Sequence, residues 1–271
     1  MKKLIFLIVC MLTFAFGMNV SAQNCSYKNT AFKSGEHLSY TLYYNWNFVW
    51  VKTGWANMTT VKSRYKGHEA YRASLTTKGN GKLDNFFILR DTLLSYTTLD
   101  MKPLYFRKGA EEGKRYTIDE VWYSYSNNKC HAKHHRENNR GKNIWKDSSY
   151  NHCVYDMMNI FLKARSFDSS NWKKGHIINL PMADGKGMSM AKLSYNGKYE
   201  IEAEDEKVYR CLSLSYIEKD DGKEMEVVRF LITDDKNHIP VRLDMHLRVG
   251  SAKAFLNKMS GIRNPITSRI K

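Results

Sequence analysis

Histidine and cysteine side chains gather in one stretch near the middle of the chain. They are Cys130, His131, His134, His135, His152 and Cys153. Thiolates and imidazoles are the usual protein ligands of zinc, which needs three or four of them arranged as a tetrahedron. If residues 129–136 form a strand, alternation places Cys130 and His134 on one face and the other two histidines on the opposite face. Two ligands on each face are too few. We therefore favour a polar hairpin over a zinc site, and we predict no metal and no other cofactor.

Carboxylates are the second set of residues that could carry chemistry. The five considered are Glu36, Asp91, Asp156, Asp234 and Asp235. Two carboxylates that meet in a cleft can serve as general acid and base. Their spacing in the sequence brings no two of them together, and Asp234-Asp235-Lys236-Asn237 is typical of a β-turn. We favour structural roles, in ion pairs and turns, for each of them.

Aromatic residues suggest ligand binding rather than catalysis. Tyr44, Trp46 and Trp50 follow one another on one face of a predicted strand, with Trp55 close behind. If that face lines an open cavity, it suits an acyl chain or another apolar ligand. Outward-facing aromatics would instead form a platform on which sugars stack, with Tyr43, Trp55, Trp122 and Tyr123 as the candidates. Packing in an ordinary core is the remaining alternative, and the one we favour.

Two long stretches show the alternation that positions these side chains. In residues 37–51 the even positions from Leu38 to Trp50 are apolar, and in residues 239–249 the odd positions from Ile239 to Val249 are apolar. Successive side chains of a strand point to opposite faces, so each stretch is predicted as a strand with one buried side. Further strands are predicted at 54–64, 70–78, 92–98, 118–125, 129–136, 177–180, 190–195, 199–204, 209–217 and 226–233.

Turn signals separate these strands, as at Tyr65-Lys66-Gly67 and Ser126-Asn127-Asn128. Asn196-Gly197, flanked by Tyr195 and Tyr199, is the clearest short hairpin signal in the chain. Residues 155–167 instead have helical spacing, with Asp156 near the start. About twelve strands at short spacing and one helix indicate a mostly β fold, either a single strongly curved antiparallel sheet or a barrel.

The N-terminus has the features of a secretory signal. Lys2-Lys3 precede an apolar run of about 13 residues, too short to span a bilayer, and Val20-Ser21-Ala22 suits cleavage between Ala22 and Gln23. We predict a soluble periplasmic protein without a transmembrane anchor. The expected domains are the signal at 1–22 and one β domain at 23–271, with 257–271 as a candidate loose basic tail.

The predicted compartment affects whether the cysteines form disulfides and which partners the positive charge can meet. An oxidising space permits two disulfides among Cys25, Cys130, Cys153 and Cys211. Cys130 and Cys153 flank a predicted hairpin and are the first choice of pair, which leaves Cys25 with Cys211; free thiols remain the alternative. The net charge of +16 favours anionic partners. The positive residues are scattered and the protein is exported, so nucleic acid is not an expected partner.

Several short blocks, in their order along the chain, resemble a bacterial exported family known as domain of unknown function 3108. They are Phe32-x-x-Gly35-Glu36-x-Leu38-x-Tyr40, Gly54-Trp55-Ala56, Phe86-Phe87-x-x-Arg90-Asp91 with Ser95-Tyr96, Pro103-Leu104-Tyr105-Phe106, and Asp234-Asp235 leading to Pro240-Val241 and Gly250-Ser251-Ala252. The likeness covers about residues 32–256. It implies a bent or barrel-like β fold in the cell envelope, and it implies no catalytic residues.

These observations favour a non-enzymatic envelope protein that binds or scaffolds an amphiphilic or glycan-like ligand. The partner is an envelope lipid, a glycan or a protein. The sequence contains neither the nucleophile elbow G-x-S-x-G nor a P-loop. The alternatives are a hydrolase of an envelope polymer that uses paired carboxylates, and a structural partner in a larger assembly.

Overall fold

The computed structural model describes residues 25–271 except 47–48, 82–88, 113–114, 221 and 248–249. The predicted signal sequence, with the cleavage site at Ala22 and Gln23, lies outside these residues. Within them, no helix is long and apolar enough to cross a membrane.

One antiparallel sheet of fourteen strands makes up most of the structure. The strands are β1 (Glu36–Trp46), β2 (Val49–Tyr65), β3 (His68–Gly79), β4 (Leu89–Thr97), β5 (Pro103–Glu112), β6 (Arg115–Ser126), β7 (Lys129–Glu137), β8 (Asn143–Tyr150), β9 (Ile177–Asp184), β10 (Gly187–Glu202), β11 (Val208–Asp220), β12 (Lys223–Thr233), β13 (Pro240–His246) and β14 (Ser251–Ser260). Consecutive strands are neighbours within β1–β8 and within β9–β14, whereas β8 and β9 do not pair. The pairing of β1 with β14 joins the two halves.

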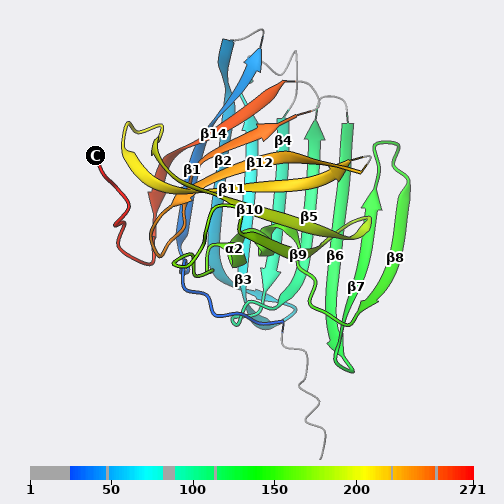
Figure 1. Cartoon of the computed structure of the whole chain (residues 1–271). Coiled ribbons are helices and arrows are strands. Elements are labelled where there is room, and N and C mark those ends of the chain that lie inside the picture. Colours follow the sequence, from blue (N-terminus) through cyan, green and yellow to red (C-terminus); the bar gives the residue numbers. More distant parts are fainter. Residues whose placement is uncertain (1–24, 47–48, 82–88, 113–114, 221, 248–249) are drawn as a thin grey trace, which may run out of the picture.

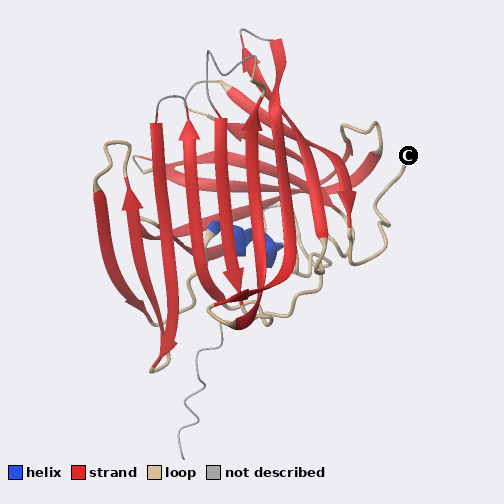
Figure 2. Ribbon diagram, turned by 180° about the vertical axis from the view of Figure 1, so that it is seen from behind, coloured by secondary structure: helices blue, strands red, loops and turns tan. Residues whose placement is uncertain are grey.

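The sheet is strongly curled but not closed into a barrel. Its edge strands are β8 and β9, and the half formed by β1–β8 crosses the half formed by β9–β14 at a steep angle (Figures 1 and 2). The predicted fold, a mostly β structure with one strongly curved antiparallel sheet, is confirmed in this open form. The two halves face each other, and their inner surfaces form the core.

The core explains the alternation in the sequence. Leu38, Tyr40 and Leu42 of β1 are buried and join one large apolar cluster with Val241 and Leu256. The burial of apolar surface contributes about 25 cal/mol per Å² to the free energy of folding, and it is the main term that holds the two halves together.

The helix α2 (Met157–Ala164) lies between the two halves, and buried polar groups hold both of its ends. At the start, Asp156 accepts hydrogen bonds from the backbone of Asn159 (2.9 Å) and from the hydroxyl of Ser95 on β4 (3.1 Å). At the end, Arg165 forms two hydrogen bonds with Glu36 of β1 (2.6 and 2.9 Å). The predicted helix within 155–167 is confirmed, with Asp156 as its N-cap.

The burial of Asp156 gives a first testable prediction. Complete burial raises the pKa of Asp156 to about 6, although its hydrogen bonds with Asn159 and Ser95 oppose the rise. The native state then binds more protons than the unfolded chain between about pH 4 and pH 6, so this group's contribution to stability falls as the pH rises through that window. The expected fall is about 3 kcal/mol, from about 1.4 kcal/mol for each pKa unit.

The measurement is the free energy of unfolding against pH for wild type and for Asp156→Asn, which can still cap the helix but cannot ionise. The wild-type curve should lose stability relative to the variant between pH 4 and pH 6. Parallel curves would contradict the prediction. Asp147→Asn, which changes an exposed aspartate on β8, should give the same slope as the wild type.

Tight turns confirm several of the sequence signals. Lys66 and Gly67 join β2 to β3 with positive φ values of 50° and 84°, and Asn127 and Asn128 join β6 to β7 with φ values of 49° and 56°. Two successive residues at positive φ give the type I′ turn that matches the twist of paired strands.

The Asn196-Gly197 hairpin prediction is wrong. β10 runs straight through these residues, and the pairing of β10 with β11 shifts its register between Tyr195 and Gly197. This bulge accommodates the positive φ of Gly197 (114°), and the Asn196 side chain donates a hydrogen bond to the hydroxyl of Ser215 (2.7 Å). A bulge uses the same residue types as a tight turn, so the local sequence did not separate the two.

Three other differences have simple causes. The stretch 37–51, predicted as one strand, contains a hairpin, because apolar alternation continues from β1 into β2. β5 was missed because its apolar residues are consecutive and follow Pro103. β8 was missed because it is an edge strand with almost every side chain exposed, so it shows no alternation.

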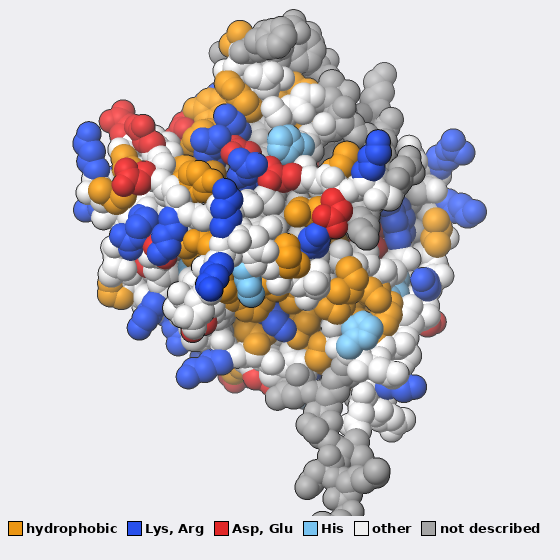
Figure 3. Space-filling model, viewed as in Figure 1, with side chains coloured by type: hydrophobic (Ala, Val, Ile, Leu, Met, Phe, Trp, Pro, Cys, Tyr) orange, Lys and Arg blue, Asp and Glu red, His pale blue; other side chains and the backbone are white. Residues whose placement is uncertain are grey.

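The C-terminal segment, considered above as a candidate loose tail, is bonded to the sheet. β14 extends to Ser260, and Ser268 and Lys271 accept backbone hydrogen bonds from Arg210 and Val208 of β11 (2.8 and 3.1 Å). Lysines and arginines are scattered over the face formed by β9–β14 rather than gathered in one patch (Figure 3).

Candidate functional site

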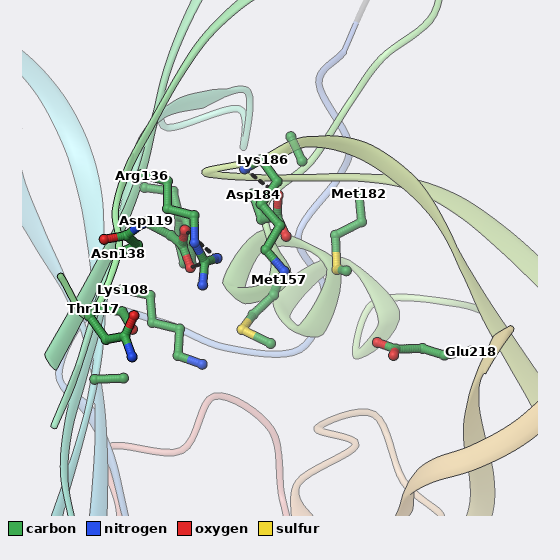
Figure 4. A pocket seen from close by; sticks show the side chains of 14 residues that line it. Lys108, Thr117, Asp119, Arg136, Asn138, Met157, Met182, Asp184, Lys186 and Glu218 are labelled. Atoms are coloured by element: carbon green, nitrogen blue, oxygen red, sulfur yellow. Dashed lines mark hydrogen bonds and ion pairs between the residues drawn. The ribbon is translucent and has the colours of Figure 1, made fainter. Parts of the chain in front are cut away.

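A cavity of about 490 Å³ lies on the inner side of the curled sheet, where β5, β6 and β7 face the hairpin of β9 and β10. Its walls come from segments far apart in the sequence, and the first residue of α2, Met157, lies between them (Figure 4). Small-molecule sites usually occupy 300–1,000 Å³ and combine an apolar lining with a few converging polar groups. The size and position of this cavity meet that description.

Three cations surround one partly buried carboxylate on the cavity wall. Asp119 of β6 forms an ion pair with Arg136 of β7 (3.0 Å), and the positive charges of Lys108 and Lys186 also act on it. Burial raises the pKa of Asp119 and the neighbouring Asp184 adds to the rise, while the cations oppose it. With Asp184, the wall has three cations and two carboxylates, and this excess of one positive charge favours an incoming anion.

The rest of the cavity is less polar and has one charge on its far side. Phe106, Ala110, Met157 and Met182 contribute apolar surface, and the side chain of Glu218 on β11 lies across from the cationic wall (Figure 4). Methionine is flexible and polarisable, so it adapts to apolar ligands of irregular shape. The cavity therefore has a charged wall and an apolar floor.

The tip of the β9–β10 hairpin contacts β6 and β7, although the edge strands β8 and β9 do not pair. His134 of β7 donates from Nδ1 to the carbonyl oxygen of Asp184 (2.6 Å). Burial lowers the pKa of His134, so its other ring nitrogen accepts from the hydroxyl of Tyr150 (3.3 Å). At Gly185 a Cβ would lie 2.3 Å from a carboxylate oxygen of Asp119. Only glycine permits this close approach.

The aromatic residues predicted to bind a ligand lie away from the cavity. Trp50 is 39% exposed and sits beside Lys253, whose Nζ is 4.1 Å from the ring, and Trp55 is 41% exposed on the outer face of β2. Tyr44 packs against the turn at Gly250, and the side chain of Trp46 lies outside the described part. Their neighbour Leu42 belongs to the packed core, and ligand binding at these aromatic residues stays a prediction.

The predicted sugar platform is only partly assembled. Trp122 lies on the outer face of the sheet near Trp145. Tyr123, by contrast, points inward and is buried, and Tyr43 packs edge-on against Phe255.

The histidines and cysteines of residues 130–153 do not converge. His134 and Cys130 are buried on the inner face of β7, whereas His135 lies on the outer face, bonded to Glu120 (2.8 Å), and His131 bonds to Ser126 (3.0 Å). His152 packs near the ring of Tyr150. The described residues contain no group of three or more His, Cys, Asp or Glu side chains placed to hold a metal ion.

The structure pairs the cysteines differently from the expected pairing. Cys25 is bonded to Cys153, and Cys130 and Cys211 are buried free thiols. Cys130 points into the core opposite Tyr150 of β8, while Cys153 follows β8 in the loop before α2, beside the N-terminal segment. The expectation failed because it used the distance along the chain, whereas pairing requires the two Cα atoms to approach within about 7 Å.

Four of the five carboxylates singled out in the sequence have structural partners, as favoured above. Glu36 pairs with Arg165, and Asp156 caps α2. Asp234 pairs with Lys198 and Arg210, and the pKa of Asp234 is lowered because these contacts outweigh its burial. Asp235 accepts from Thr233 and Ser268, and the backbone N–H of Asp91 donates to Thr77 (3.0 Å).

Sequence reasoning missed the residues of the cavity. Lys108, Asp119, Arg136 and Lys186 belong to no motif and are separated by up to 78 positions. One signal was present: alternation along residues 115–126 places charged Asp119 on the same face as buried Val121 and Tyr123. A charge on the apolar face of a strand indicates an opening or a partner on that side.

Comparisons with known proteins agree on the fold. The model of a family described as a protein of unknown function, DUF3108, matches residues 39–257. The structure is similar to a crystal structure described as a beta-barrel-like protein of domain of unknown function DUF1849 from Brucella abortus, with a TM-score of 0.55 and 11% identity; the alignment covers 86% of this chain and 100% of that one. At this identity the likeness shows the fold alone. The comparison with curated proteins gives no match.

Proposed function

The chain belongs to the DUF3108 family of proteins of unknown function, and from the geometry of this member we propose a non-catalytic binding protein whose inner cavity takes a small amphiphile with an anionic head group. The observation that carries the proposal is the division of the cavity into a cationic wall and an apolar floor. The head group pairs with Lys108 and Lys186. The apolar part packs against Met157 and Met182.

The charges support an anion rather than a cation at this wall. Arg136 is neutralised by Asp119, whereas neither lysine forms an ion pair with another described residue. A charge-assisted hydrogen bond to each lysine contributes about 1.5–3 kcal/mol when the site excludes water. Glu218 on the far side repels a second anionic group and so orients a ligand with one charged end.

We also propose that the protein is exported and works in the periplasm, where it meets envelope lipids. The disulfide between Cys25 and Cys153 supports this location, because disulfides persist in oxidising compartments. The sequence signal at residues 1–22 supports it independently.

The alternative of a hydrolase with paired carboxylates rests on one observation. Asp119 and Asp184 lie in the same cavity, and the pKa of Asp119 is raised by burial. Both groups already have partners, however: Arg136 holds Asp119, and Asp184 accepts from the backbone of Lys186 and Gly187 (2.7 and 3.2 Å). These contacts support binding over proton transfer.

Calorimetric titration with dodecanoate tests the binding proposal. We expect saturable binding at one site, weakened about tenfold or more in Lys108→Gln and in Lys186→Gln, because each variant removes one charge-assisted bond. Met157→Trp should abolish binding by filling the cavity from the exposed start of α2. Lys258→Gln, an exposed lysine on β14, is the matched control and should bind as the wild type does.

Three further results would count against the proposal. Equal affinity for dodecanol would show that the ligand needs no anionic head group. Undiminished binding in Met157→Trp would place the ligand outside this cavity. No binding of either compound, with none retained in native mass spectra of gently purified protein, would reject the carrier function.

A further inference from the structure

A row of aromatic side chains crosses the outer face of the sheet, on the opposite side from the cavity. The row consists of Tyr65, Tyr96, Tyr105, Trp122 and Trp145, from β2, β4, β5, β6 and β8. This face belongs to the half formed by β1–β8, which is turned toward the reader in Figure 2. The row is not part of the apolar core, so the hydrophobic effect in the interior does not explain it.

Strand register places the rings side by side. Tyr96 lies opposite Tyr105, and Tyr105 lies opposite Trp122. Their sequence neighbours Ser95, Phe106 and Val121 are buried, so the aromatic rings point outward by alternation. Beyond β7, Trp145 of the edge strand β8 continues the row and is 54% exposed.

The rings are offset rather than fully stacked. The centroids are 5.4 Å apart for Tyr105 and Trp122, 5.8 Å for Trp122 and Trp145, and 5.9 Å for Tyr65 and Tyr105. Full overlap would bring the centroids closer, so each ring keeps part of its surface uncovered. With about 4.8 Å between strands, the row from β4 to β8 extends about 19 Å. That length suits several linked rings rather than one small molecule.

A network of polar side chains on the same face holds the rings in place. Tyr105 donates its hydroxyl to Glu120, which also accepts from His135 Nδ1 (2.8 Å), and His135 bonds to Asn143 (2.6 Å). His135 stacks under Trp145 at a centroid distance of 4.1 Å. A surface that is already rigid loses little conformational entropy when a ligand binds.

A groove of about 610 Å³ runs beside Trp122 and adds hydrogen-bonding groups and charge. Its lining includes Ser124, Ser126 and Ser149, whose side chains are hydroxyls, and the ammonium groups of Lys66 and Lys133. The two ammonium groups lie against aromatic rings, at 5.5 Å from Tyr65 and 4.8 Å from Trp145, and neither forms an ion pair with a described residue. Among the described residues of the lining, Asp147 is the one carboxylate against two lysines, so their net charge is positive.

We propose that this outer face is a second binding site, for an acidic polysaccharide whose sugar rings bear carboxylates. The C–H faces of the sugars pack against the aromatic row, because these faces are weakly positive and the π faces are negative. Sugar hydroxyls bond to the serines of the groove. The sugar carboxylates pair with Lys66 and Lys133 at opposite ends of the row. The inner cavity is not involved, so this site is independent of the amphiphile proposal.

The test is titration calorimetry of the protein with polygalacturonate, with dextran as a neutral polysaccharide and polyglutamate as an acidic polymer without sugar rings. We expect polygalacturonate to bind, dextran to bind at least tenfold more weakly, and polyglutamate more weakly than polygalacturonate. Trp145→Ala and Trp122→Ala should each weaken binding about tenfold or more, as buried aromatic anchors do, and Trp122→Phe should retain part of the affinity. Lys133→Gln should reduce both the affinity and its dependence on salt.

Trp55→Ala is the matched control, because Trp55 is exposed on the same face but outside the row. It should bind as the wild type does, and thermal unfolding of every variant checks that the sheet is intact. Equal binding of dextran would overturn the requirement for acidic sugars, and equal binding of polyglutamate would overturn the role of the rings. No binding of polygalacturonate, or full binding by folded Trp122→Ala and Trp145→Ala, would overturn the site.

Discussion

Replacing Glu36 by glutamine is expected to lower the free energy of unfolding by about 3–5 kcal/mol. Glu36 and Arg165 are only 1% and 2% exposed, and they are joined by two hydrogen bonds of 2.6 and 2.9 Å. The substitution leaves the guanidinium buried without a counter-charge, with the carbonyl of Asn237 as a remaining partner (3.1 Å). An uncompensated buried charge is among the most destabilising changes that one substitution can make.

Urea unfolding followed by tryptophan fluorescence measures this loss. Glu224→Gln is the matched control: Glu224 is 2.7 Å from Lys192, but both side chains are partly exposed, so the loss should be below about 1 kcal/mol. Replacing both buried partners, as Glu36→Leu with Arg165→Met, should recover much of the stability, since no charge then remains buried. If Glu36→Gln were as mild as the control, the ion pair would not hold α2 to β1.

Removing the disulfide in the Cys25→Ser, Cys153→Ser double variant is expected to lower the free energy of unfolding by about 2–5 kcal/mol. The bond joins residues separated by 128 positions. It therefore removes much of the freedom of the unfolded chain, which is the main source of disulfide stabilisation in the chain-entropy account. It also holds the N-terminal segment beside the loop that leads into α2.

The number of cysteines that react with an alkylating agent, before and after reduction, checks which disulfide is present. Unfolded protein beginning at Gln23 should take up two alkyl groups before reduction and four after it, with the first two on Cys130 and Cys211. A reducing agent should destabilise the wild type by the same amount as the double variant, and it should leave the double variant unchanged. Four groups taken up without reduction, or labelling at Cys153, would contradict the pairing.

The sites differ in how far the sequence could have located them. Trp122 was identified as a possible sugar contact, but its partners Tyr96, Tyr105 and Trp145 were not. Two of these three lie on β5 and β8, the strands without clear alternation. The row exists only because strand register aligns them. In the cavity, Lys186 reaches Asp119 because a hairpin tip crosses to the far half of the sheet, which no local pattern encodes.

The sequence by itself determined the features that depend on neighbouring residues. Alternation identified most of the strands, the Lys66-Gly67 pair identified a turn, and Asp156 identified the start of the helix, because each is a property of a few consecutive side chains. The tertiary structure decided what depends on long-range approach. It placed Cys25 against Cys153 and Glu36 against Arg165, and it made Asn196-Gly197 a bulge instead of a hairpin. The physical reason is that these outcomes follow from how the curled sheet brings its two halves together, and that geometry is set by the packing of the whole core rather than by any one segment.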